Sequence, residues 1–161
     1  MTTENAIQLL SPTSLEEFDA VKILFREHEK ELAEDVCFQN FGVEMKNIQT
    51  IYSLPAGALV LATHQGEAVG VVAMVCNDSG VCEMKRLYVR PNWRKKGIGK
   101  ILCKKIMNVA KKASYSSMRL ETLSRLDAAI ALYLDLGFKI HEEPKKTIDS
   151  DKNIYVMVSS L

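Results

Sequence analysis

A basic segment with two glycines lies where a strand is expected to give way to a helix. It reads Arg94-Lys95-Lys96-Gly97-Ile98-Gly99-Lys100. Glycines remove side chains where a backbone must approach a ligand, and the first turn of a helix offers unpaired N–H groups and the positive end of its dipole to an anion. The segment therefore suggests a binding site for a pyrophosphate. A glycine-rich turn that only begins a helix is the alternative.

This segment matches neither of two common phosphate-binding fingerprints. The dinucleotide fingerprint G-x-G-x-x-G needs a third glycine where Leu102 stands, and no G-x-x-x-x-G-K-S/T loop occurs in the chain. The sequence thus predicts a phosphate site of another kind.

The surrounding chain has the pattern of a mixed sheet with helices. Ser14 and Glu17 form a capping box for a first helical region that extends to about residue 51. We expect further helices at 98–113 and 127–136, and strands at 7–10, 58–63, 68–75, 81–89, 118–121, 138–140 and 154–158, the last of which closes the sheet. Short turns make the strands from 58 to 89 antiparallel, whereas the crossover helix predicts that 81–89 and 118–121 run parallel. The expected class is α/β (α+β), with a mostly antiparallel sheet.

Composition limits the class of protein. The 161 residues are 47% hydrophobic and 25% charged, with a net charge of +1, so we expect one globular domain over 1–161 and no nucleic acid partner. No apolar run approaches the ~20 residues of a membrane helix, and the first residues lack the pattern of a signal peptide, which predicts a cytoplasmic protein without a membrane partner. The four cysteines have no C-x-x-C spacing and the three histidines no ligand or triad spacing, so we predict no metal and assign the histidines no chemistry.

Three linked motifs resemble the GNAT superfamily of N-acetyltransferases. The segment from Arg94 to Gly99 fits the family's R/Q-x-x-G-x-G/A motif between a strand and a helix. Before it, 87–93 resembles the family's fourth strand and its exit. After it, Ala129-Ile130-Ala131-Leu132-Tyr133 with Gly137-Phe138 resembles A-x-x-L-Y-x-x-x-G-F. The resemblance implies a fold in which the fourth and fifth strands splay apart at a cleft for acetyl-CoA.

The resemblance also implies which residues bind the co-substrate. Backbone N–H groups of Arg94, Lys95, Lys96, Gly97, Ile98, Gly99 and Lys100 would hold the coenzyme A pyrophosphate. The strand residues Leu87, Tyr88 and Val89 would line the pantetheine arm, Leu87 and Val89 through their main chain. An N–H of Leu87 or Val89 aimed at the thioester oxygen would stabilise the oxyanion that forms when an amine attacks. Ordinary strand core is the alternative for these residues.

Glu83 is the candidate general base. An amine acceptor is protonated at neutral pH and must lose a proton before it attacks. Glu83 lies six residues before Val89, a spacing at which family members place a catalytic Glu, and simple alternation puts 83, 85, 87 and 89 on one face. Lys85 on that face could pair with Glu83 and lower its pKa, which would make Glu83 structural.

Tyr133 matches the family's general acid, which protonates the coenzyme A thiolate as it leaves. The alternative is a core aromatic whose hydroxyl lies at the edge. Leu126 departs from the family, because many members carry Asn seven residues before this tyrosine.

The sequence favours direct transfer of acetyl from acetyl-CoA to a primary amine of a small or amino-acid-like molecule. Lys85 and Arg86 could hold a carboxylate of that acceptor, and the acidic segment 27–35 could attract a cationic amine, although a solvated helix face also explains it. A non-catalytic domain that senses acetyl-CoA is the alternative function. A homodimer is compatible with the sequence and not required by it.

Overall fold

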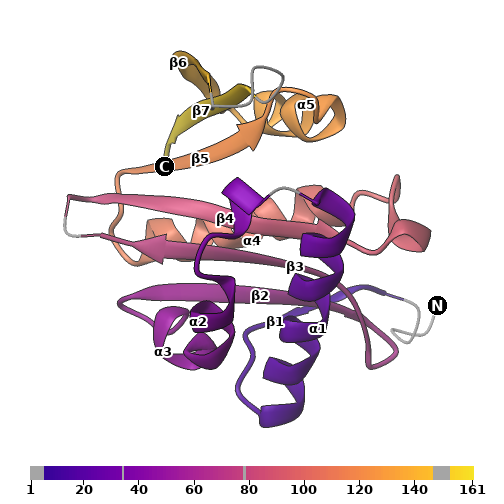
Figure 1. The fold of residues 1–161 in the computed structure, drawn as a ribbon. Coiled ribbons are helices and arrows are strands. Elements are labelled where there is room, and N and C mark those ends of the chain that lie inside the picture. The colour runs from indigo at the N-terminus through magenta and orange to yellow at the C-terminus, as the bar shows by residue number, and fades with distance from the viewer. Residues whose placement is uncertain (1–5, 34, 78, 147–152) are drawn as a thin grey trace.

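In the computed structural model, which describes residues 6–33, 35–77, 79–146 and 153–161, seven strands form one sheet (Figure 1). The strands are β1 (Gln8–Leu10), β2 (Gly57–His64), β3 (Glu67–Cys76), β4 (Val81–Val89), β5 (Ser117–Leu123), β6 (Lys139–Lys146) and β7 (Asn153–Ser160). Their order is β1-β2-β3-β4-β5-β7-β6, and β4 and β5 are the parallel pair. The mixed, mostly antiparallel sheet is therefore as predicted.

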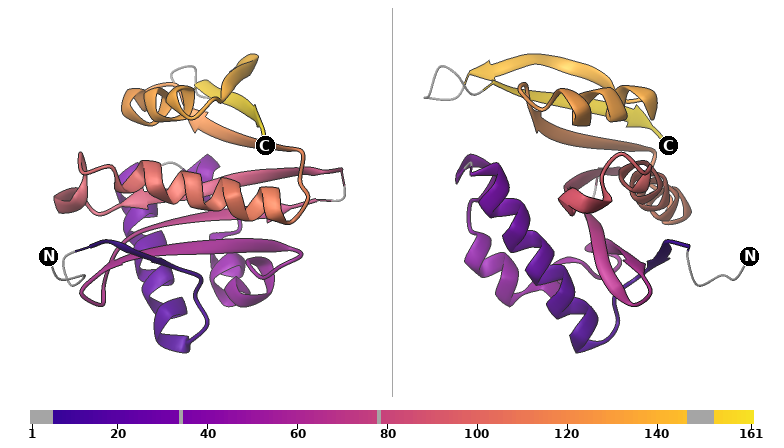
Figure 2. Two further views of the ribbon diagram at one scale, coloured as in Figure 1. Left: turned by 180° about the vertical axis from the view of Figure 1, so that it is seen from behind. Right: turned by 90° about the vertical axis from the view of Figure 1, so that its right-hand side faces the viewer.

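The helices lie on both faces of the sheet. They are α1 (Leu15–Leu32), α2 (Phe41–Lys46), α3 (Ile48–Ile51), α4 (Ile98–Lys112) and α5 (Asp127–Asp135), with 3-10 helices η2 (Asp35–Phe38) and η3 (Pro91–Trp93). Helices α1, α2 and α3 cover one face of the first four strands and α4 covers the other (Figures 1 and 2). In the described part of the chain, no helix is long and apolar enough to cross a membrane.

The first helical region differs in detail from the prediction. The Ser14 hydroxyl accepts a hydrogen bond from the Glu17 N–H at 3.1 Å, as the capping box predicted. However, Ala33 takes a left-handed backbone conformation (φ 51°) that ends α1, so three short helical segments follow in place of one helix to residue 51. Residue 34, part of the acidic segment, and Asp78 in the β3–β4 turn lie outside the described residues.

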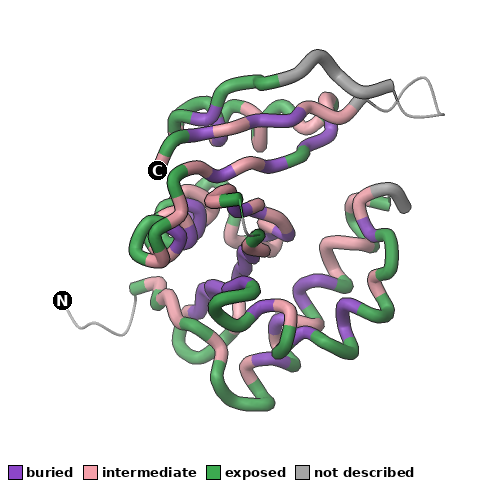
Figure 3. Tube along the Cα trace, turned by 90° about the vertical axis from the view of Figure 1, so that its left-hand side faces the viewer, coloured by how far each residue is buried: buried purple, intermediate pink, exposed green. Residues whose placement is uncertain are grey.

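The core consists of one apolar cluster on each face of the sheet. Leu102 and Ile106 of α4 are fully buried against β2, β3 and β4, while Val21, Leu24 and Phe25 of α1 are fully buried against the opposite face. In Figure 3, buried and exposed stretches alternate along α1, because successive residues of an amphipathic helix turn toward and away from the sheet. These two clusters hold β4 firmly between the helices.

A β-bulge in β4 corrects the predicted alternation of its side chains. The register against β3 shifts between Val71 and Ala73, and Arg86 has a positive φ of 60°. Before the bulge, Met84 packs with α4, so Glu83 and Lys85 lie on the α1 face. After the bulge the faces exchange: Tyr88 joins the α1 cluster, whereas Leu87 and Val89 pack toward α4. Positions 83, 85, 87 and 89 therefore do not share one face.

The last strand is not at the edge of the sheet, contrary to the expectation that it closes the sheet. Strand β7 pairs antiparallel with both β5 and β6, so β6 forms the edge. Together, β5, β6, β7 and α5 form a unit that lies to one side of β4 (Figure 2). Only β4 and β5 connect this unit to the rest of the sheet within the described residues.

Candidate active site

The parallel strands β4 and β5 separate soon after they begin. Their register comprises Val81 with Ser117, Cys82 with Met118 and Glu83 with Arg119, and no pair is found between these two strands beyond it. A cavity of about 320 Å³ lies where they part, lined by residues of β4, β5, α1, η2 and α5. The splay that the resemblance implied is therefore present, because β4 continues for six residues without β5 beside it.

Glu83 and Tyr133, the two predicted catalytic residues, both line this cavity. The tertiary structure thus brings together side chains that are 50 positions apart in sequence. Arg86, Leu87 and Leu126 line it as well. At the position where many family members carry Asn, an apolar side chain therefore borders the cavity.

The partner of Glu83 is Arg119 and not Lys85. Nη1 of Arg119 forms an ion pair with the Glu83 carboxylate, and its Nη2 donates to Glu121 at 3.1 Å. Lys85 lines the same cavity, yet its side chain forms no hydrogen bond or ion pair with any described residue. The Glu83–Lys85 pair that the sequence left open is not found among the described residues, because β5 supplies a guanidinium directly across the parallel register.

Tyr133 is a buried residue of α5, with 8% of its surface exposed. Its ring meets that of Phe138 edge-on at 6.0 Å. Its hydroxyl has no hydrogen-bond partner among the residues described. Burial raises the pKa of Tyr133 above its ordinary value, with a smaller contribution from Cys103. The phenol is consequently a proton donor that does not ionise near neutral pH.

Arg86 is held in a buried network that includes Glu44 of α2. Its Nε and Nη2 donate to the two carboxylate oxygens of Glu44 at 3.0 and 2.7 Å, and its Nη1 donates to the carbonyl of Cys37 at 2.6 Å. Tyr52 donates to the same carboxylate at 3.0 Å. Although burial opposes ionisation of Glu44, the hydrogen bonds and charge of Arg86 outweigh it and hold the pKa of Glu44 below its usual value. This network fixes α2 and η2 against β4.

His28 of α1 also lines the cavity, and the sequence assigned it no role. Its ring stacks on Tyr88 at 5.4 Å and meets Phe38 edge-on at 5.4 Å. Burial, and then the positive charge of Arg86, lower the pKa of His28 to about 4, so the imidazole is neutral at physiological pH. A single histidine on a helix gives no spacing signal, which explains why the sequence could not single it out.

The glycine segment forms the turn into α4. Gly97 caps the helix with a φ of 79°, and a Cβ placed on it would meet no atom within 4 Å. The first helical hydrogen bond runs from the Ile101 N–H to the Gly97 carbonyl, so the N–H groups of Ile98, Gly99 and Lys100 have no partner within the helix. The turn therefore offers open space and several free donors to an anion.

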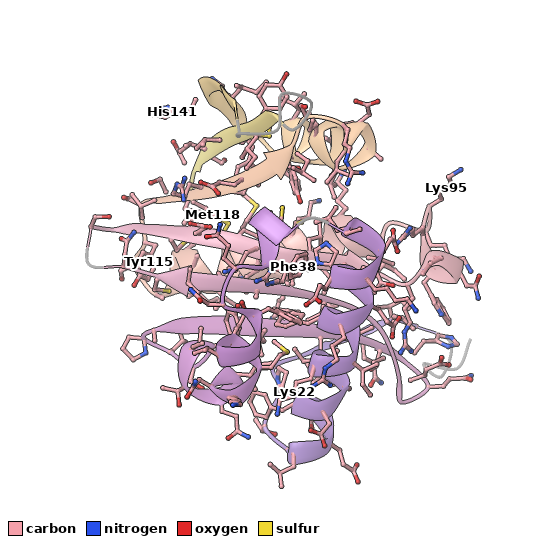
Figure 4. The ribbon with its side chains drawn as sticks, in the orientation of Figure 1. Lys22, Phe38, Lys95, Tyr115, Met118 and His141 are labelled. Carbon is pink, nitrogen blue, oxygen red and sulfur yellow. The ribbon has the colours of Figure 1, made fainter. Side chains whose placement is uncertain are left out.

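The basic side chains of this turn are largely engaged elsewhere. Arg94 donates to the Val89 carbonyl and to Glu31 of α1, both at 2.8 Å. Lys100 pairs with Asp135 of α5 at 2.7 Å. Lys95 projects outward at the margin of the molecule (Figure 4). Lys96 lies over the ring of Trp93 at 5.0 Å. An anion at this turn would thus be bound mainly by backbone groups.

The end of β4 presents its backbone toward the gap. The Arg90 N–H donates to the Val69 carbonyl on β3 at 2.9 Å, so by alternation the Val89 N–H points away from β3, to the side from which β5 has parted. The acidic segment of α1 lies on the other face, where Glu27 pairs with Arg90 at 2.8 Å. Two of its carboxylates, Glu27 and Glu31, are therefore already bound by arginines.

A profile of the acetyltransferase (GNAT) family matches residues 20–138. This chain belongs to that family. A Schizosaccharomyces pombe N-acetyltransferase of undetermined specificity is 40% identical over 129 residues, which is 79% of each chain. The N-acetylaspartate synthetase of Xenopus tropicalis is 38% identical over 98 residues, 60% of this chain and 36% of its own. The match thus spans about a third of that synthetase.

Solved structures of the family have the same fold. An acetyltransferase of the GNAT family from Staphylococcus aureus superposes with a TM-score of 0.78 at 18% identity, over 96% of this chain and 99% of its own. A Bacillus anthracis acetyltransferase in complex with acetyl coenzyme A superposes with a TM-score of 0.61 at 21% identity, over 66% and 64%. Membership of the family, together with its N-acetyltransferase relatives, makes this chain an acyltransferase that uses acetyl-CoA as its co-substrate.

Proposed function

We propose that this GNAT protein, acting as one domain over residues 1–161, transfers acetyl from acetyl-CoA directly to the primary amine of a small, amino-acid-like molecule. The observation that carries this proposal is the cavity at the parting of β4 and β5, which Glu83 and Tyr133 both line. The cavity lies between β4, along which the thioester would run, and the helices α1 and α5. This space could hold an acceptor. A volume of about 320 Å³ suits a small molecule better than a folded protein.

In this mechanism the turn from Arg94 to Lys100 binds the pyrophosphate through its free N–H groups. Leu87, Tyr88 and Val89 flank the pantetheine arm, and the Val89 N–H donates to the thioester oxygen, which carries negative charge when the amine attacks. The open space above Gly97 and the unpaired N–H groups that follow it support this assignment.

Glu83 removes the proton of the acceptor ammonium, directly or through a water molecule. Its ion pair with Arg119 uses one carboxylate oxygen, Oε2, and leaves the other without a hydrogen bond to any described residue. Tyr133 donates a hydrogen bond to the sulfur as the C–S bond breaks, because its proton is retained in the buried site.

The amino-acid-like acceptor is supported by one relative as well as by the cavity. The Xenopus tropicalis synthetase named above makes, by its name, an N-acetylated amino acid. The matched 98 residues cover 60% of this chain and 36% of the synthetase. This partial match supports an amino acid as the class of acceptor.

The test is an activity screen of the purified protein with acetyl-CoA and a panel of amines, in which release of the coenzyme A thiol is followed. We expect thiol release that depends on an amine and yields a product heavier by one acetyl group. Binding of acetyl-CoA without release in the presence of any amine would instead favour the sensing domain. Acetylation confined to protein lysines would contradict a small acceptor.

A further inference from the structure

Lys85 lines the cavity without an ion pair to any described residue. The carboxylates of Glu83 and Glu121 both bind Arg119, and the guanidinium of Arg86 binds Glu44. Lys85 is near enough to Glu44 to contribute to its lowered pKa, yet it forms no hydrogen bond or ion pair with a described residue. Its ammonium is therefore free to pair with an anion that enters the cavity.

His28 presents a second unused polar group. Its Nδ1 is buried without a hydrogen-bond partner in the part of the chain that the structure describes. Its Nε2 has no such partner either and is not among the buried atoms, and it belongs to a side chain that lines the cavity. A buried N–H without an acceptor is rarer in proteins than a buried acceptor without a donor, so we assign the proton of the neutral ring to Nε2.

The ring of His28 is also held in place. Tyr88 stacks on it and Phe38 contacts it edge-on, each at 5.4 Å between ring centroids (Phe38 is labelled in Figure 4). Burial and then the guanidinium of Arg86 oppose its protonation, the carboxylate of Glu31 favours it, and Arg94 opposes it to a smaller extent, so that the pKa of His28 falls to about 4. A fixed, neutral imidazole with an N–H toward the cavity is a hydrogen-bond donor.

We propose that Lys85 and His28 form a subsite that binds a carboxylate of the acceptor, so that the substrate is an amine that also carries a carboxylate. The proposal rests on the proposed function and narrows it to this class of amine. The ammonium of Lys85 attracts the carboxylate, and the Nε2–H of His28 orients it through a hydrogen bond. Amines without an anionic group leave both donors without a partner on the acceptor, which selects against them.

The experiment compares amino acids with their amides, using L-aspartate, L-alanine and L-alaninamide as acceptors. An amide has the less basic amine and should react at least as readily on chemical grounds. We therefore expect kcat/KM to be about 10²-fold or more higher for L-alanine than for L-alaninamide, and this preference would indicate the subsite. Equal use of the two would overturn the proposal.

Variants test the roles of Lys85 and His28 as donors separately from any effect on folding. Lys85→Met should remove most of the preference for a carboxylate, whereas Lys111→Met, at the exposed far end of α4, should leave it intact. His28→Phe keeps the ring contacts and removes both nitrogens, so KM for L-aspartate should rise about 10- to 100-fold with acetyl-CoA affinity unchanged. His28→Gln, which restores a donor near Nε2, should recover part of this loss.

A thermal melt distinguishes a ligand-binding His28 from a structural one. Because His28→Phe removes an unpaired buried nitrogen, the variant should melt at the same or a higher temperature while it loses affinity for the acceptor. Unchanged kinetics in this variant would make His28 a packing residue and overturn its part of the subsite.

A binding measurement keeps this test independent of turnover. L-aspartate is titrated by calorimetry into protein saturated with coenzyme A, and then into the Lys85→Met variant under the same conditions. Binding to the first that is lost in the second supports the subsite even if no amine is acetylated, an outcome that would count against the proposed function alone. Absence of binding to either would overturn the subsite.

Discussion

At the scale of single residues, the environment of each candidate residue determines which chemical role it can perform. Glu83 lies against a guanidinium from the neighbouring strand, and Tyr133 is buried with its hydroxyl unpaired among the described residues. His28, which lines the same cavity, has an unpaired nitrogen. Buried polar groups without partners are uncommon in native proteins and tend to occur at sites of function. Polar side chains with unusual surroundings therefore gather around this cavity.

Replacement of Glu83 tests its role as general base. We expect Glu83→Gln to lower turnover by ~10²-fold or more, the usual range for a lost general base, while acetyl-CoA binding remains. Glu121→Gln is the matched comparison, because Glu121 contacts the same Arg119 and should lose far less activity. Single-turnover rates across pH provide the measurement. A Glu83→Gln variant with the turnover and pH dependence of the wild type would make this residue structural.

Replacement of Tyr133 tests the proton donor. Because burial raises the pKa of Tyr133, a hydrogen bond to the departing sulfur is easier than full proton transfer. Tyr133→Phe should therefore reduce single-turnover acetylation by about 10-fold, less than the ~10²–10⁴-fold that complete acid catalysis contributes. The melting temperature should change little, since the hydroxyl has no partner among the described residues.

The control for this substitution is Tyr115→Phe, in the connection between α4 and β5 (Figure 4). It should leave the rate of acetyl transfer unchanged. Full activity of Tyr133→Phe would reduce Tyr133 to a core aromatic residue.

At the scale of elements, the turn into α4 and the bulge in β4 set the geometry of the site. The bulge exchanges the faces of β4, so Glu83 and Lys85 lie on the side of α1, and Leu87 and Val89 on the side of α4. Ion pairs of Glu27 with Arg90 and Glu31 with Arg94 then join α1 to the exit of β4. In the proposed mechanism, the acceptor side and the coenzyme side are thus parts of one strand.

A charge reversal at the turn tests the pyrophosphate site. A Cβ on Gly99 would lie 3.4 Å from Cδ2 of Leu132, an ordinary contact distance, so the backbone can accept a side chain there. Gly99→Glu places a negative charge beside the free N–H groups, and we expect acetyl-CoA to bind at least about 10²-fold more weakly. Gly99→Ala, measured by the same titration, should lose much less.

A second variant controls for the added charge alone. Gly42→Glu adds a carboxylate at an exposed position of α2 and should leave acetyl-CoA binding unchanged. An unaltered dissociation constant in a folded Gly99→Glu variant would remove this turn from the site.

At the scale of the whole molecule, the sheet consists of two parts joined through a short parallel register. Three residue pairs connect β4 to β5, whereas β2 and β3 pair along most of their length. The ion pair of Lys100 with Asp135 joins α4 to α5. A ligand that lies along β4 against α4 and α5 would add contacts where the protein itself has few.

Acetyl-CoA should therefore raise the thermal stability of the molecule. At 100 times its dissociation constant, a ligand that binds only the folded state stabilises it by about 2.7 kcal/mol. For a chain of this length we expect a rise in melting temperature of ~5–10 °C, measured by a thermal melt with and without acetyl-CoA. The Gly99→Glu variant should show no such rise. A wild-type protein that melts at the same temperature with saturating acetyl-CoA would contradict binding in this position.

Local signals in the sequence were sufficient for most elements and for the glycine turn that begins α4. The apolar period of α4, the capping box before α1 and the glycines from 97 to 99 each act over a few neighbouring residues, so their structural effects can be predicted without knowledge of the fold. The parallel pairing of β4 and β5 followed from chain order, because a crossover helix lies between the two strands.

The surroundings of Glu83, Arg86 and His28 were decided only by the tertiary structure. The register of β4 with β5 places Arg119 against Glu83, a contact across 36 positions. The bulge at Arg86 reverses the faces of β4, and alternation along a strand cannot reveal a bulge in advance. The packing of α1 brings His28 beside Tyr88, although no local pattern distinguishes it from any other helical histidine. Such contacts depend on which distant side chains meet, and this is determined when the complete chain packs.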